Sequence, residues 1–165
     1  MIHAPERAAH IKRKLDETKD QPGGETYTLK NWRASDLTLP IIELDNAYMA
    51  YSIGDARTSS MHFQYGREHP EVGYFFFQNA EDERVQTAQQ DIMLTMVKNR
   101  YFGESFLENP VVRGREPVII TADGTIVKGN FSVAILREIG ERILYCVVLP
   151  EDATPAEIEN IVDAY

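Results

Sequence analysis

Residues 115–162 read REPVIITADGTIVKGNFSVAILREIGERILYCVVLPEDATPAEIENIV, and this stretch decides the fold class. Two short apolar runs rich in β-branched residues, at 117–121 and 125–127, lie on either side of Ala122-Asp123-Gly124. An Asp-Gly pair supplies the positive φ angles that a tight hairpin turn requires. The stretch therefore predicts a β-hairpin.

A helix, a strand and a second helix follow the hairpin. Gly129-Asn130 opens the first helix, which we expect to continue to about Ile139, with Gly140 as its C-terminal cap. The continuous apolar run 143–149 predicts a buried strand. Thr154-Pro155-Ala156-Glu157 is a capping box with proline in the first turn, and it starts a helix that continues to the end of the chain. This order predicts an α/β (α+β) fold, in which helices flank a small mixed sheet.

The N-terminal region has its own organisation. Apolar residues at spacings of three and four predict a helix over 5–16, and Gln21-Pro22-Gly23-Gly24 is the clearest linker in the chain. We therefore expect residues 1–25 to form a separately mobile arm and residues 26–165 to form the domain.

The chain between the linker and the hairpin has weaker signals. We expect an extended run at 27–32, a strand at 39–44, a turn-rich segment at 53–60 and a helix at 80–98 with an apolar stripe. The aromatic run Tyr74-Phe75-Phe76-Phe77 lacks the interleaved cations of a surface that stacks nucleobases. We interpret it as core.

Composition limits the classes of function. The chain has 165 residues with 17 Lys and Arg against 26 Asp and Glu, a net charge of −9, which argues against electrostatic coating of nucleic acid. The single Cys146 excludes an internal disulfide and a multi-cysteine zinc site, and the four histidines show no metal-ligand spacing, so we expect no metal ligands. Neither a signal peptide nor a membrane-spanning run is visible. We expect a cytoplasmic protein with no membrane association.

The motifs of residues 115–162 resemble those of the ParB N-terminal/sulfiredoxin-like superfamily. Its members carry Gln/Glu-Pro before a hydrophobic strand, then Asp-Gly, a second strand, Gly-(Asn/Glu)-Arg-Arg at a helix start, a buried strand, and a proline with an acid before a last helix. This chain follows that order without a gap. Residues 39–57 resemble the family's first strand and its upstream arginine segment, whereas residues 1–33 show no resemblance.

The resemblance implies a fold that holds nucleotide phosphates against the turn before the helix. Activities in the superfamily include CTP-dependent DNA clamps for chromosome and plasmid partition, ATPases, nucleases, a free-serine kinase and sulfiredoxins. Many members belong to bacterial plasmid, phage and defence systems. The implied ligand is ATP or CTP with Mg²⁺, and the implied partners are other proteins and DNA bound through another domain or subunit.

Carried over by position, Gly129 and Asn130 form the phosphate turn, and Asp123-Gly124 forms the hairpin beneath it. Glu116 takes the place of the family's Gln or Glu before the proline, and Arg57 takes that of the upstream arginine. The candidate catalytic residues are Glu116 and Asn130. The candidate ligand-binding residues are Arg57, Arg115, Asp123, Gly124, Lys128, Gly129, Asn130, Ser132 and Arg137.

The chain departs from the family at the two arginines. Phe131 and Ser132 stand in their places, and neither side chain supplies the charged fork that arginine offers to phosphate. Lys128 and Arg137 are the residues placed to compensate, with an ion pair to Glu141 as the alternative for Arg137. The position of Cys146 in a strand instead of the turn argues against sulfiredoxin activity.

The sequence leaves two functions open, of which we expect the first, with the second as the alternative. The intact Asp-Gly and Gly-Asn pairs favour a nucleotide- or phosphate-binding domain of a DNA-directed system, with hydrolysis of nucleotide or nucleic acid as an additional activity. The lost arginines and the net negative charge favour a non-enzymatic interaction or regulatory module that keeps the fold. Partition-type relatives usually continue into a helix-turn-helix, so we expect this chain either to have lost that part or to be a fragment.

Overall fold

The computed structural model describes residues 1–21, 23–73, 76, 78–99 and 116–163. Within these ranges six α-helices, a 3-10 helix and two small sheets form a mixed α/β structure, which confirms the predicted fold class. None of the helices in this described part is long and apolar enough to cross a membrane.

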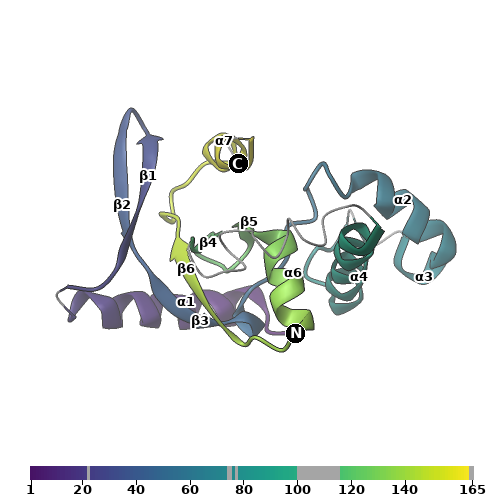
Figure 1. Ribbon diagram of the computed structural model, residues 1–165, viewed down its shortest axis with the longest axis horizontal. Helices are drawn as coiled ribbons and strands as arrows, with labels where there is room; N and C mark the ends of the chain where they lie inside the picture. Colours follow the sequence, from purple (N-terminus) through teal and green to yellow (C-terminus); the bar gives the residue numbers. More distant parts are fainter. Residues whose placement is uncertain (22, 74–75, 77, 100–115, 164–165) are drawn as a thin grey trace.

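The central sheet has four strands in the order β3-β6-β4-β5 (Figure 1). β6 lies in the interior, antiparallel to β3 and parallel to β4, and β4 pairs with β5 as the predicted hairpin. The predicted buried strand is therefore confirmed as well. The bounds are β3 (Ile42–Asp45), β4 (Val118–Ile120), β5 (Ile126–Lys128) and β6 (Ile143–Val148).

One face of this sheet forms the main core. Alternate strand residues point to opposite faces, and those of the first face pack with apolar residues of α1 (Ala4–Lys19), α4 (Glu83–Asn99) and α6 (Asn130–Glu138). The sheet contributes to this core Ile42, Leu44, Val118, Ile120, Ile126, Leu144, Cys146 and Val148.

The other face is covered by a hairpin and the last helix. The hairpin consists of β1 (Thr26–Trp32) and β2 (Ser35–Pro40), and α7 (Pro155–Asp163) lies beside it (Figure 1). Leu29, Trp32 and Ile161 pack on Ile119, Val127, Val147 and Leu149. The predicted capping box of α7 is confirmed, because the Thr154 and Glu157 side chains accept hydrogen bonds from each other's backbone N–H.

Three helices form a smaller lobe at the other end of the molecule (Figure 1). These are α2 (Ser59–Glu68), α3 (Pro70–Gly73) and the first half of α4, and neither α2 nor α3 was predicted from the sequence. Phe76 is buried in this lobe, in line with its interpretation as core. Tyr74, Phe75 and Phe77 lie outside the described residues.

The structure differs from two further expectations. The single strand expected at 39–44 is divided between β2 and β3, because the chain leaves one sheet and enters the other at Ile41. The first helix, expected as a separately mobile arm, is packed on the domain: Ile11 is fully buried in the main core, and α1 contacts β3 and the 3-10 helix η1 (Asn46–Tyr48).

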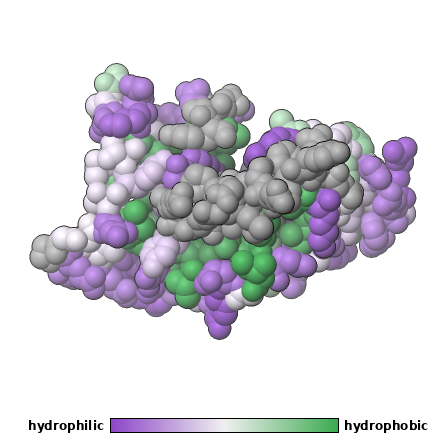
Figure 2. Space-filling view, in the orientation of Figure 1, coloured by the Kyte–Doolittle hydropathy of each residue, from purple (hydrophilic) through white to green (hydrophobic). Residues whose placement is uncertain are grey.

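Part of the apolar surface is left uncovered. In Figure 2 hydrophobic side chains gather in the lower centre of the visible face, in the region of β6 and α6. The exposed large apolar residues of these elements and of the turn between them are Ile139, Ile143 and Tyr145.

Candidate functional site

The turn between β5 and α6 is the predicted phosphate turn. Gly129 is the N-cap of α6 and has a φ of 110°, which a residue with a side chain rarely adopts. Its carbonyl oxygen accepts the first helical hydrogen bond, from Val133 N–H, at 2.8 Å. The sequence Lys128-Gly129-Asn130 thus folds as expected, with glycine required at its centre.

The side chain of Asn130 is directed into the protein. Only 3% of the residue is exposed, and its Oδ1 accepts a hydrogen bond from the backbone N–H of Ser52 at 3.1 Å. Ser132, in the same helical turn, is also 3% exposed. The side-chain amide of Asn130, which was predicted to bind phosphate, therefore binds the backbone of Ser52 instead.

Three side-chain amides, those of Gln86, Gln89 and Asn130, bind the backbone at residues 51–52, just before the segment that contains Arg57. The Gln86 side chain accepts from Tyr51 N–H at 2.7 Å and donates to the Tyr51 carbonyl oxygen at 3.1 Å. Gln89 donates to the Ser52 carbonyl oxygen and to the Thr58 hydroxyl. With Asn130, these groups satisfy the backbone at 51–52 as a neighbouring strand would. This ordered segment then presents residues 55–57 to α6.

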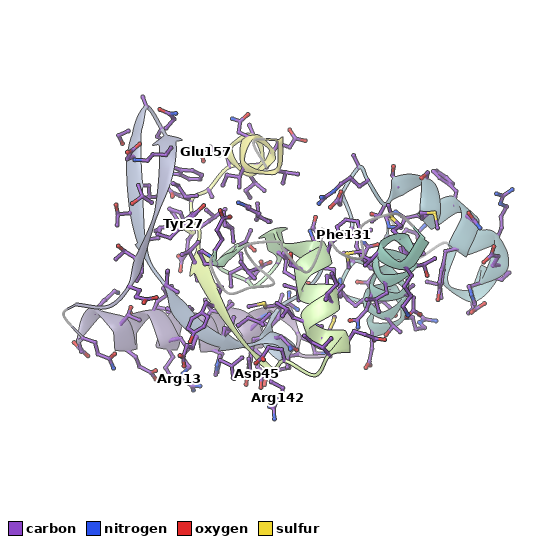
Figure 3. All side chains as sticks on the ribbon, in the orientation of Figure 1. Arg13, Tyr27, Asp45, Phe131, Arg142 and Glu157 are labelled. Carbon is purple, nitrogen blue, oxygen red and sulfur yellow. The ribbon has the colours of Figure 1, made fainter. Side chains whose placement is uncertain are left out.

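Arg57 lies against the first turn of α6. Its guanidinium carbon is 4.7 Å from the centre of the Phe131 ring, a cation–π distance, and Phe131 projects from the upper end of α6 toward the helical lobe (Figure 3). The same guanidinium binds both oxygens of Asp55, at 2.9 and 2.6 Å. Burial raises the pKa of Asp55, but the Arg57 hydrogen bonds outweigh it and leave that pKa below its usual value. Arg57, the upstream arginine of the motif, therefore lies near the Gly129-Asn130 turn, and its charge is paired with the carboxylate of Asp55.

Lys128 and Glu116 form the second ion pair. Lys128 Nζ lies 3.0 Å from Glu116 Oε2, and the Lys128 side chain is 15% exposed. Glu116, expected as an acid or base, is therefore neutralised by the lysine expected to bind phosphate. Arg115 lies outside the described residues.

Arg137 does not compensate for the missing arginines. It donates to the carbonyl oxygens of Asn46 and Met49 and lies 4.6 Å from the ring centre of Tyr51. At 1.5 Å per residue it is about 10 Å along α6 from the turn. Neither expectation for this residue holds: it binds carbonyl groups at the far end of the helix, and Glu141 is not its partner.

Asp123 and Gly124 form the tip of the β4–β5 hairpin. Asp123 Oδ1 accepts hydrogen bonds from the Thr125 N–H and the Thr121 hydroxyl. Gly124 has a φ of 85°, and a Cβ there would lie 2.4 Å from the carbonyl oxygen of Tyr48. The tip packs so closely on η1 that only glycine fits.

Sequence reasoning missed the residue that holds this tip. Arg7 is completely buried, binds Glu81 through two hydrogen bonds of 2.7 Å and donates from Nε to the Asp123 carbonyl oxygen at 2.8 Å. Arginine in a basic helix is usually solvated. One signal was available, since Arg7 is four residues from Ile11 and so shares its buried face.

His62 is another buried polar residue, outside the predicted site. Its Nε2 lies 2.6 Å from Gln89 Oε1, and its ring stacks on Phe76 at 4.6 Å. Burial lowers its pKa and favours the neutral imidazole. No group of three His, Cys, Asp or Glu that could hold a metal ion occurs in the described part of the chain.

Comparisons of the chain with protein-family models, with curated proteins and with solved structures found no match. The resemblance drawn from the motifs stays a prediction.

Proposed function

We propose that this chain is a binding module, which acts by non-covalent contact in an assembly or regulatory role and does not transfer or hydrolyse phosphate. One observation carries the proposal: each described cation at the start of α6 has its own carboxylate. Lys128 lies 3.0 Å from Glu116, and Arg57 lies 2.6 Å from Asp55. These two pairs present no net positive charge, whereas a nucleoside triphosphate is held by such charge.

The expected catalytic groups support the same proposal. A general acid or base must come within hydrogen-bond distance of the reacting proton. The Asn130 oxygen is occupied by Ser52 N–H inside the protein, and Glu116 is paired with Lys128. Both residues contribute to the framework of the turn.

The motif resemblance suggests the setting. In this proposal the chain derives from the ParB/sulfiredoxin-like superfamily, has kept its fold and has lost the phosphate-binding arginines. It works in the cytoplasm within a DNA-directed system of the partition, plasmid, phage or defence type. Its contacts are with partner proteins, and DNA is bound through another domain or subunit.

Binding of ATP or CTP at the start of α6, with Mg²⁺, is the second candidate. It is favoured by the left-handed Gly129 at the helix N-terminus with Arg57, whose side chain is 62% exposed, packed on that first turn. Helix N-termini flanked by arginine are suited to anions. Bound nucleotide would then have to displace Asp55 from Arg57.

Calorimetric titration with ATP, CTP and GTP, with and without Mg²⁺, separates the two candidates. We expect no binding at millimolar nucleotide and no release of phosphate. Glu116→Gln removes the carboxylate that pairs with Lys128 without changing side-chain shape, and Arg57→Gln removes the other cation. The binding-module proposal fails if the unaltered chain binds nucleotide, the Glu116→Gln variant binds it more tightly, and the Arg57→Gln variant binds it at least about ten-fold more weakly.

A further inference from the structure

A pocket of about 410 Å³ lies between the β4–β5 hairpin, the loop at 150–153 and α7. Its volume is within the range of about 300–1,000 Å³ that small-molecule sites occupy. It borders the candidate site through Ser52, whose backbone Asn130 holds. The lining residues on which the inference rests are Ser52, Asp123, Thr125, Glu151, Ile158 and Val162.

The lining has two different ends. Its polar lining residues are Ser52, Thr121, Asp123, Thr125 and Glu151, whereas the α7 side is apolar, with Ile158 half-buried and Val162 40% exposed. No lysine, arginine or histidine is among the described residues that line it. An anionic ligand would meet only negative charge here.

Hydrogen bonds favour the ionised form of Asp123. Its Oδ1 accepts from Thr125 N–H and the Thr121 hydroxyl. Burial raises its pKa, but these hydrogen bonds outweigh burial and the pKa is lowered overall. Arg7 donates to the Asp123 backbone carbonyl oxygen and is neutralised by Glu81. These three side chains together therefore leave one negative charge beside the pocket.

We propose that this pocket binds a ligand with one ammonium or guanidinium group on an apolar body. The cation contacts Asp123 and Glu151, and the apolar body packs on Ile158 and Val162. Residues 149–165 carry five acids and no base, and the segment stays net negative although Arg33 pairs with Asp152 and Glu157, so it attracts such a cation from a distance. The inference rests on the proposed function, because it names the chemistry that the binding module recognises.

A cation of this kind comes from a free small amine or from a lysine or arginine side chain of a partner. Benzamidine is a suitable probe for the first source, with benzamide and benzoate as ligands of the same shape that are neutral and anionic. For the second source the probes are the blocked tripeptides Leu-Arg-Leu and Leu-Glu-Leu. Chemical-shift changes on titration measure binding of both sets and identify the residues contacted.

We expect benzamidine to bind at millimolar concentration and to shift the signals of Thr125 and Val162, with benzamide weaker by about five- to ten-fold and benzoate not binding. Asp123→Asn keeps the hydrogen bonds of the turn and should weaken benzamidine by about five-fold, and Glu151→Gln by less, because Glu151 is exposed. Glu159→Gln, an exposed acid of α7 that does not line the pocket, is the matched control and should have no effect. Leu-Arg-Leu binding more tightly than benzamidine identifies a protein partner as the source.

Equal binding of benzamidine and benzamide, or equal effects of Asp123→Asn and Glu159→Gln in folded variants, would overturn the inference. Nucleotide titration of the same samples distinguishes failure of this inference from failure of the proposed function. Absence of both benzamidine and nucleotide binding refutes this ligand and leaves the binding module in place. Nucleotide binding by the unaltered chain, with the changes in the Glu116→Gln and Arg57→Gln variants given above, refutes the module itself.

Discussion

At the scale of single residues, Arg7 joins parts of the chain that are far apart in sequence. From α1 it reaches Glu81 before α4 and the Asp123 carbonyl at the tip of the β4–β5 hairpin. A fully buried guanidinium is tolerated only where its charge and its N–H groups are compensated. Arg7 therefore fixes α1 on the hairpin.

Arg7→Met should lower the free energy of unfolding by about 2–4 kcal/mol, because Glu81 and the Asp123 carbonyl lose their donors. Urea denaturation measures the change. Arg13→Met, on the exposed side of the same helix, is the control and should change stability by less than about 0.5 kcal/mol. Equal effects of the two substitutions would contradict the role given to Arg7.

Gly124 and Gly140 allow a paired test of close packing. Their φ angles are nearly equal, 85° and 84°, but a Cβ on Gly124 would meet Tyr48 while one on Gly140 meets nothing within 4 Å. Gly140→Ala should cost about 1 kcal/mol for backbone strain alone. Gly124→Ala should cost at least about 2 kcal/mol more, because η1 must move. Thermal denaturation of both variants gives the difference, and similar losses would show that the contact is unimportant.

At the scale of elements, the β1–β2 hairpin is tied to α7 by Arg33, which pairs with Asp152 at 2.9 Å and Glu157 at 2.6 Å. Arg33 and Ala34 form the two-residue loop, and both have positive φ, a conformation that costs about 1–2 kcal/mol in residues other than glycine. Glu157 faces the hairpin from α7 (Figure 3). The ion pairs hold an otherwise unfavourable turn in place.

The pH dependence of stability should report this contact. The Arg33 hydrogen bond, followed by the Thr154 N–H, lowers the pKa of Glu157 from 4.5 to about 2. The stabilisation is therefore complete above about pH 4.5 and is lost as pH falls toward 2. Glu157→Gln keeps the capping box and should flatten this part of the curve measured by urea denaturation. Glu159→Gln serves as the control, and an unchanged slope in Glu157→Gln would refute the assignment.

Local signals account for the elements that the sequence predicted. Asp123-Gly124, Gly129 and the Thr154–Glu157 box set the turns and caps of residues 118–163, and all depend on neighbours in the chain. α2 was missed because its burial depends on Phe76 and on Gln89 of α4, which reach it only in the folded chain. Contacts between residues far apart in the chain could not be predicted from local sequence patterns.

The candidate site shows the same division. The motif resemblance predicted that Arg57 lies near the start of α6, and its contact with Phe131 agrees. The carboxylates that neutralise Arg57 and Lys128 did not follow from the motif, since Glu116 was assigned to catalysis. The inward direction of Asn130 depends on Ser52, 78 residues earlier in the chain.

At the scale of the whole molecule, α1 belongs to the folded unit. It buries Ile11 in the main core, and the Gln21–Gly24 segment connects it to β1. Removal of residues 1–20 should lower the melting temperature by about 10 °C or more, since several kcal/mol of packing and the Arg7 contacts are lost. Insertion of four glycine and serine residues into the linker leaves these contacts and should cost less than about 1 kcal/mol. A truncated chain that melts like the full one would mean that α1 is an arm after all.

Because Cys146 is buried in the central sheet, its reaction with a thiol reagent can report how often that sheet opens. Cys146 is the only thiol, it has no exposed surface in the interior strand β6, and burial raises its pKa to about 12. A thiol reagent can react only with molecules in which β6 has been exposed, because the thiolate does not form in the closed sheet. The rate of modification, followed by mass spectrometry as urea increases, should therefore equal the population of opened sheet multiplied by the rate for a free thiol. Any bound partner that lowers the population of molecules with an opened sheet would slow this reaction, whatever the chemistry of the partner.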